Sequence, residues 1–305
     1  MPSLYKYLSS ARCDVLATCR LRFTQAADFN DPFELLPSFD VDSGAARGDE
    51  FLEQLEHDVA EYYTHNPAST LDDGESLTRL AEVIAKRLPL KRGVDPRDLV
   101  LSALEILPVR ARLGYGLRIQ RDFGDRLGIL SLGETPDVLL MWAHYADCHR
   151  GFVVEFDADH AFFHQGLPDS HLGTVQPVRY SNERPGFSLG AEPMPGGVAH
   201  YLSSVLLTKS PEWSYEREWR MVVDLNDEAR FPRDVMGRVH LFHVPPECIT
   251  GVIFGNRCAR TVRDRVFEIL AANPALGHVE VRYSHLDPAR FATRIDRSPW
   301  PTHFV

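Results

Sequence analysis

The stretch EWSYEREWRMVVDL, residues 212–225, carries two carboxylates and a guanidinium at alternate positions. Side chains alternate between the faces of a β-strand, so a strand here places Glu216, Glu218 and Arg220 on one face, with the Cα atoms of neighbours on that face roughly 7 Å apart. A solvated face can carry such charges for solubility alone. The same arrangement also suits a polar site mounted on a rigid element, which makes Glu216 and Glu218 candidate site residues.

A second segment, MWAHYADCHRGFVVEFD at residues 141–157, combines aromatic and imidazole side chains where a helix is expected to meet a strand. Aromatic faces stack on bases and nicotinamide rings, so Trp142, His144 and Tyr145 are candidate ligand-binding residues. A second interpretation remains open. In it, Trp142 and Tyr145 pack in the core while His144 binds a backbone carbonyl.

The same segment contains three residues that often bind metals, His144, Cys148 and His149. A helix would place His144 and Cys148 on one side, but a zinc site needs a third and a fourth ligand at close range. Because the sequence offers no convincing remaining ligands, we predict that no metal is required.

A third segment, FNDPFE at residues 29–34, has two interpretations. Asn-Asp-Pro forms turns without any functional reason, and Asn30 and Asp31 can instead orient a neighbouring catalytic side chain. The chain has no serine-elbow, Walker, H-E-x-x-H or EF-hand pattern, which argues against serine acyl transfer and P-loop phosphoryl transfer.

The elements expected to position these residues are mostly strands. A first strand is predicted at SLYKYL, and RLRFTQAADFNDPFEL is predicted to contain a second strand and a turn. Further strands are predicted at GILSLGE, GFVVEFD, VQPVRYS, EWRMVVDL, VHLFHV, CITGVIFG and HVEVRYS. The stretch TVRDRVFEILAANP predicts a helix with Val262, Val266 and Ile269 on one face. Residues 48–127 have helical spacing instead, as in Leu52, Leu55, Val59 and Tyr62. We therefore predict a single α+β domain over residues 1–305, with a mixed or antiparallel β core and a helical insertion at 48–127.

Composition limits the class of protein. The chain has 305 residues, 44% hydrophobic and 25% charged, with a net charge of −10, so a broad basic surface for nucleic acid is not expected. No stretch approaches the roughly 20 apolar residues of a membrane helix, and the N-terminus lacks a signal-peptide pattern. Five scattered cysteines indicate reduced thiols. We expect a cytoplasmic protein with no membrane partner.

Seven stretches are similar, in order, to the bacterial family called domain of unknown function 2971. They are LYKYL, LRFTQAADFNDPFE, ILSLGE, MWAHYADCHRGFVVEFD, VRYS, KSPEWSYEREWRMV and VIFGNR. The resemblance runs from residue 4 to residue 284, with the helical block as its variable part. The family name carries no activity.

More distantly, the N-terminal LYKY strand and the late Glu-x-Glu strand resemble the ADP-ribosyltransferase superfamily. That resemblance implies an NAD-cleaving fold in which Lys6 or Arg22 holds NAD and Glu218 performs the chemistry. Glu216 would be the first member of the Glu-x-Glu pair. Many relatives carry His where this chain has Lys6, and the serine-threonine-serine element is absent.

By the same resemblance, Tyr145 or Trp142 stacks on nicotinamide, and Tyr7 and Arg220 complete the cofactor-binding set. NAD is then a substrate, the acceptor is a protein or nucleic acid, and the protein acts as a toxin or phage-defence effector. Cleavage passes through an oxocarbenium-like state that a positioned carboxylate stabilises. Two alternatives stay open: a nucleotide or nucleic-acid hydrolase using His144, Glu216 and Glu218, with or without a metal, and a non-enzymatic nucleotide-sensing module.

Overall fold

The computed structural model describes residues 3–40, 57–58, 61–62, 64–66, 79–80, 82–84, 120, 124–166, 172–188 and 204–298. The chain forms two compact units. The first comprises Met1–Glu34, Phe123–Glu183 and Leu206–Val305, and the second comprises Leu35–Asp122 and Arg184–Val205.

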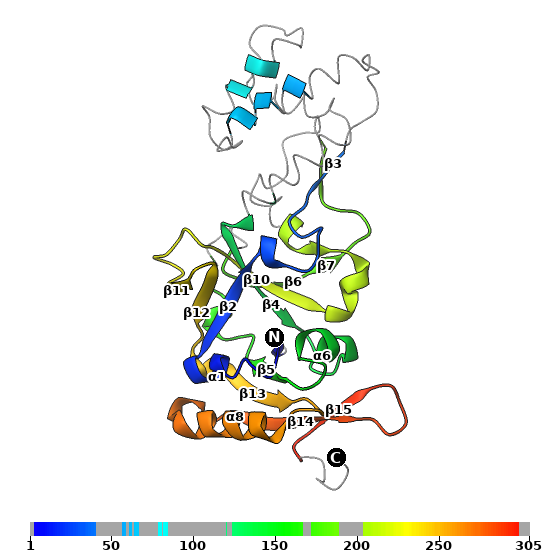
Figure 1. Ribbon diagram of the computed structural model, residues 1–305, viewed down its shortest axis with the longest axis vertical. Coiled ribbons are helices and arrows are strands. Elements are labelled where there is room, and N and C mark those ends of the chain that lie inside the picture. Colours follow the sequence, from blue (N-terminus) through cyan, green and yellow to red (C-terminus); the bar gives the residue numbers. More distant parts are fainter. Residues whose placement is uncertain are drawn as a thin grey trace. The chain divides into compact units, whose positions relative to one another are not determined.

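The first unit is built on an 11-stranded sheet (Figure 1). Its strands are β1 Leu4–Leu8, β2 Arg20–Gln25, β4 Leu127–Gly133, β5 Phe152–Phe156, β6 Val175–Pro177, β10 Glu218–Asp224, β11 Arg233–Met236, β12 Val239–His243, β13 Ile249–Phe254, β14 Glu280–Leu286 and β15 Thr293–Asp296. Strands β13 and β14 pair in parallel, and the other pairings in this sheet are antiparallel. The expected mixed, mostly antiparallel α+β fold is therefore confirmed.

The sheet forks at β4. One edge of β4 pairs along its whole length with β10, from Glu218 opposite Gly133 to Asp224 opposite Leu127. The other edge has two partners, because β2 pairs at Gly128 and Ile129 whereas β1 pairs at Gly133. Strands β1 and β2 thus diverge between these points. Residues 130–132 of β4 lie at the opening of the fork.

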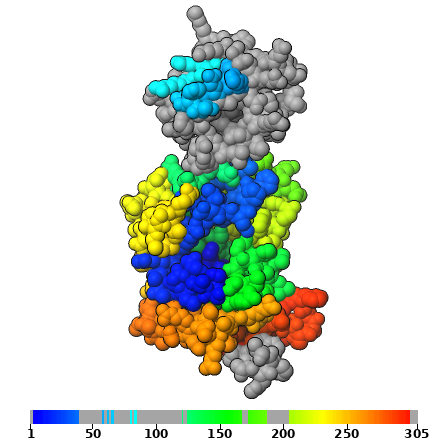
Figure 2. Space-filling model, viewed as in Figure 1, coloured from blue at the N-terminus to red at the C-terminus, as the bar shows by residue number. Residues whose placement is uncertain are grey.

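Helices and short helical turns surround the sheet. Among the described residues of the first unit, the complete α-helices are α1 Asp14–Thr18, α6 Leu139–Tyr145 and α8 Arg260–Ala272, and the 3-10 turns are η1 Ala26–Asp28, η2 Ala161–Phe163, η3 Pro211–Glu216, η4 Pro246–Cys248 and η5 Pro274–Leu276. Helix α8 buries Val266 and Ile269 against the core, as its spacing predicts. Figure 2 shows its orange residues directly beside the blue N-terminal residues, consistent with the contact between α1 and α8.

The core is aromatic and aliphatic, as the strand patterns require. Strand β5 places Phe152, Val153, Val154 and Phe156 at 0% exposure, so both of its faces are covered. Fully burying one such side chain contributes roughly 1.5–3 kcal/mol. This rigid centre fixes β1 and β13, which pair with β5 on either side.

The second unit contains β3 Ser38–Asp40 and β8 Gly186–Ser188, which pair in parallel. Most of the predicted helical insertion at 48–127 lies outside the described residues. Its described residues include helical positions at 57–58, 61–62, 79–80 and 82–84. Tyr62, Leu80 and Ile84 are buried, as their helical spacing suggests. The boundaries of the insertion stay a prediction.

The strand predicted at EWRMVVDL is present as β10, but it does not extend back to Glu216. Residues Pro211–Glu216 form η3, Arg217 adopts a left-handed conformation with φ of 42°, and the strand begins at Glu218. Proline at the first position of η3 favours a helical start, so a single strand face that carries Glu216, Glu218 and Arg220 does not form. Glu216 and Glu218 therefore come from different elements.

Among the described residues, no helix has the length and apolar character needed to cross a membrane.

Candidate functional site

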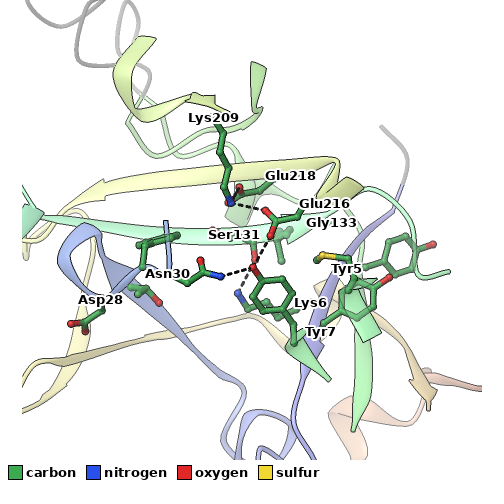
Figure 3. Close-up of a pocket in the computed structure, with 15 residues that line it drawn as sticks. Tyr5, Lys6, Tyr7, Asp28, Asn30, Ser131, Gly133, Lys209, Glu216 and Glu218 are labelled. Atoms are coloured by element: carbon green, nitrogen blue, oxygen red, sulfur yellow. Dashed lines mark hydrogen bonds and ion pairs between the residues drawn. The ribbon is translucent and has the colours of Figure 1, made fainter. Parts of the chain in front are cut away.

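A cavity of about 320 Å³ lies at the fork of the sheet. Five parts of the first unit line it: β1, the end of β2 with the turn that follows, the last residues of β4, helix α6, and the segment from β9 (Thr208–Lys209) to β10. Its lining residues are Tyr5, Lys6, Tyr7, Thr24, Asp28, Phe29, Asn30, Ser131, Leu132, Gly133, Met141, Tyr145, Lys209, Glu216 and Glu218 (Figure 3).

Glu216 is held from two sides. The Tyr145 hydroxyl donates to its Oε1 at 2.6 Å, and the Lys209 ammonium donates to its Oε2 at 2.6 Å. The Asn30 amide in turn donates to the Tyr145 oxygen at 3.1 Å. Burial and the adjacent carboxylate of Glu216 raise the pKa of Tyr145 above its ordinary value, so its proton stays on the oxygen. The Glu216 carboxylate therefore has a fixed orientation in the cavity.

Glu218 is as buried as Glu216 and belongs to a buried ion network. Arg220 donates to its two oxygens at 2.8 and 3.0 Å, and Lys209 donates at 3.2 Å. Burial opposes ionisation of Glu218, but the charges of Arg220 and Lys209 outweigh it and lower its pKa to about 2. Glu218, 5% exposed, is thus an ionised carboxylate at the cavity wall.

The backbone of Glu218 is also fixed. Strands β7 (Arg179–Tyr180) and β9 pair in parallel beside it, and the Tyr180 hydroxyl accepts a hydrogen bond from the Glu218 amide at 2.8 Å. Strand β9 supplies Lys209, whose ammonium lies 4.6 Å from the centre of the Trp213 ring. One small sheet therefore orients both the carboxylate and the cation that contacts it.

Lys6 occupies the opening of the fork. Its ammonium donates to the Ser131 carbonyl at 2.8 Å, at the point where β4 lies between its two partner strands. Burial lowers the pKa of Lys6 to about 8, although the charges of Glu218 and Glu216 act to raise it. Two lysines line the cavity. Lys209 forms ion pairs with Glu216 and Glu218, whereas Lys6 forms no ion pair with a carboxylate in the described part of the chain.

The structure brings six of the predicted site residues to this cavity. They are Lys6, Tyr7, Asn30, Tyr145, Glu216 and Glu218. The remaining five do not line it. They are Arg22, Asp31, Trp142, His144 and Arg220.

Two of these five lie beneath the cavity wall. Arg220 is fully buried, and its guanidinium binds Glu34, Glu218 and the Leu206 carbonyl, so it has no position from which to hold a phosphate. Trp142 is also fully buried, and it packs edge-on against Tyr7 with ring centres 5.4 Å apart. We therefore correct the prediction that Arg220 and Trp142 contact a ligand. Both side chains instead support residues that line the cavity, Arg220 by binding Glu218 and Trp142 by packing against Tyr7.

The other three lie beside it. Arg22 pairs with Asp28, which does line the cavity. The Asp31 carboxylate accepts a hydrogen bond from the Phe33 amide at 2.9 Å. This bond is typical of a turn, so it agrees with the first of the two interpretations of the FNDPFE segment. His144 is exposed, with its ring 6.2 Å from that of Tyr145. Within the described residues, no three His, Cys, Asp or Glu side chains are grouped as metal ligands.

Residues 141–221 match the model of a family described as protein of unknown function (DUF2971). The DUF2971 segment contains Tyr145, Lys209, Glu216 and Glu218, so it supplies both glutamates of the cavity. It also contains Arg220. The match supports the family resemblance over this segment. No curated protein and no solved structure matches the chain.

Two contributors to the site were missed in the sequence. Lys209 lies three positions before the aromatic and acidic run that begins at Glu212, and it is one of only four lysines in the chain. Glu34 ends the FNDPFE segment and binds Arg220 at 2.8 Å across 186 positions of sequence. The rarity of lysine was a signal for the first. Nothing in the local pattern identified the second.

Replacing Tyr145 with Phe is expected to lower the free energy of unfolding by about 1.5–3 kcal/mol, because Glu216 loses a hydrogen bond to its charged carboxylate. Tyr215→Phe is the matched control, since its hydroxyl has no hydrogen bond within the described residues, and it should change stability by less than about 0.5 kcal/mol. Urea unfolding of the three proteins measures both effects. Equal losses for the two variants would contradict the assigned role of the Tyr145 hydroxyl.

Proposed function

We propose that the cavity binds NAD and that the protein cleaves the bond between nicotinamide and ribose, as ADP-ribosyltransferases do. The observation that carries this proposal is the convergence of Glu216 and Glu218 with aromatic side chains on one cavity at the fork of the sheet. Tyr7, Phe29 and Tyr145 offer rings for a planar heterocycle. The ionised carboxylate of Glu218 suits a reaction in which positive charge develops on a sugar ring.

The charges of the site fit such a transition state. The buried group contains three carboxylates (Glu34, Glu216 and Glu218) and two cations (Lys209 and Arg220). Glu218 keeps its negative charge in this network, and that charge can stabilise a ribosyl cation inside the cavity. Lys6 is the cation positioned to bind the diphosphate of the dinucleotide, because no carboxylate of the described residues pairs with it.

The two carboxylates have different roles in this proposal. Glu218 is anchored on β10 and by Arg220, and it stabilises the developing ribosyl cation. Glu216 lies at the end of η3, is held by Tyr145, and orients the acceptor. A protein or nucleic-acid acceptor would accordingly approach from the side of Glu216.

One observation favours a second candidate, a module that binds a nucleotide without cleaving it. Both carboxylates are already engaged by Lys209, and Glu218 is also engaged by Arg220. Such paired groups can define a binding pocket without taking part in chemistry. Activity and binding must therefore be measured separately.

Incubation of the purified chain with NAD is expected to release free nicotinamide, which chromatography quantifies against a protein-free control. Isothermal titration calorimetry at low temperature measures NAD binding in parallel. Release above the control supports the enzyme. Binding without release supports the sensing module, and the absence of both rejects the cavity as an NAD site.

A further inference from the structure

The chain contains only four lysines, Lys6, Lys86, Lys91 and Lys209, against a total of 33 lysines and arginines. Two of the four line the same cavity. Arginine stays protonated in proteins and is not a nucleophile, whereas a lysine amine can lose its proton when it is desolvated. A chain that uses arginine almost everywhere else thus places two amines at one site.

The two amines have opposite environments. The Lys209 nitrogen lies between two carboxylates, 2.6 Å from Glu216 and 3.2 Å from Glu218, and 4.6 Å from the centre of the Trp213 ring. The Lys6 nitrogen instead donates to a neutral acceptor, the Ser131 carbonyl. Lys6 is half-buried and lines the open cavity, so a small molecule can reach it.

We propose that Lys6 is a nucleophilic amine that forms a Schiff base with an aldehyde bound in the cavity. The aromatic and apolar wall formed by Tyr7, Phe29, Met141 and Tyr145 suits an aldehyde with an aromatic body. The amine nitrogen bonds to the carbonyl carbon, and its two protons leave with the carbonyl oxygen as water. No oxidant or reductant is needed for this step.

Four charged groups act on Lys6, from different elements. Glu218 on β10 and Glu216 on η3 favour its protonated form, whereas Arg12, which precedes α1, and Arg22 on β2 disfavour it. Burial is the largest influence, and together they lower the pKa of Lys6 to about 8. At pH 7.5 about a quarter of such amines are neutral, against roughly one in a thousand for an ordinary lysine.

The test uses pyridoxal, an aromatic aldehyde, and the complete chain without NAD. Protein and aldehyde are mixed at pH values from 6.5 to 9.5, the imine is trapped with borohydride, and adducts are located by peptide mass mapping. We expect Lys6 to be labelled at least about tenfold faster than Lys209 at pH 7.5. Its labelling should reach half of its maximum near pH 8. Lys6→Arg, which keeps the charge but removes the amine, should abolish that adduct.

The proposal is overturned if Lys6 is labelled no faster than Lys209. It is also overturned if labelling of Lys6 increases only when the pH exceeds the ordinary pKa of lysine. The map of the wild-type protein decides this without any variant, so misfolding of Lys6→Arg leaves the test intact. The inference does not depend on NAD cleavage. A protein that forms the Lys6 adduct but releases no nicotinamide supports this inference and rejects the transferase. Protection of Lys6 by added NAD would place both ligands in one cavity.

Discussion

Glu218→Gln is expected to lower the rate of nicotinamide release by about 10²–10³-fold, a loss of about 3–4 kcal/mol of transition-state stabilisation. Glutamine keeps the size of the side chain and one of its two acceptor oxygens, but it removes the negative charge that faces the developing ribosyl cation. Initial rates of nicotinamide release at saturating NAD measure the effect. Equal rates for the wild type and this variant would remove Glu218 from the mechanism.

Folding must be separated from chemistry in this comparison. On an exposed strand face, Glu218→Gln would leave stability almost unchanged, but in the structure Glu218 neutralises two buried cations. Glu34→Gln disturbs the same network from outside the cavity, since Glu34 also binds Arg220, and it serves as the control for lost stability. We expect Glu34→Gln to reduce nicotinamide release far less than Glu218→Gln at a temperature where circular dichroism shows both proteins to be folded.

Two further glutamate variants refine the assignment. Glu212→Gln changes an exposed residue of η3 that does not line the cavity, so it should leave the rate of nicotinamide release unchanged. Glu216→Gln should reduce the transfer of labelled ADP-ribose to an acceptor more than it reduces NAD cleavage. A larger effect of Glu216→Gln on cleavage than of Glu218→Gln would exchange the roles of the two carboxylates.

The strands of the first unit were predictable because burial leaves a clear local signal. In β5, Phe152, Val154 and Phe156 alternate with Val153, and the continuous apolar run matches a strand covered on both faces. The helix α8 was predictable for the same reason, through Val266 and Ile269. Short elements such as β9 and β15 were missed, since their pairing depends on partners elsewhere in the chain.

The members of the site were predictable by residue type, but their depth was not. Trp142 and Tyr145 lie three positions apart on α6, and the sequence does not tell which of them faces the cavity and which the core. Arg220 looked like a phosphate ligand beside Glu218 for a similar reason. Its partner Glu34 ends the FNDPFE segment, 186 positions earlier in the sequence. The structure shows that the guanidinium is fully buried against this carboxylate, and the local sequence around Arg220 does not reveal it.

Arg220→Met is expected to lower the free energy of unfolding by about 3–5 kcal/mol, because methionine fills part of the space but leaves the Glu34 and Glu218 carboxylates buried without their main cation. Arg238→Ala is the control. It breaks an ion pair with Asp125 in which both side chains are more than half exposed, and it should cost at most about 1 kcal/mol. Urea unfolding at pH 7 measures both variants. Similar losses for the two would show that the buried network contributes little.

The pH dependence of this difference identifies the carboxylate responsible. The pKa of Glu218 is about 2 in the folded protein and lies near 4.3 in an unfolded chain, so its ion pairs stabilise the fold above about pH 5. That contribution, about 3 kcal/mol, is lost as the pH falls from about 5 to about 2. The wild type should lose it over this interval, whereas Arg220→Met has lost most of it already. The gap in stability between the two proteins should therefore narrow as the solution is acidified, and a constant gap would assign the destabilisation to lost packing around Arg220.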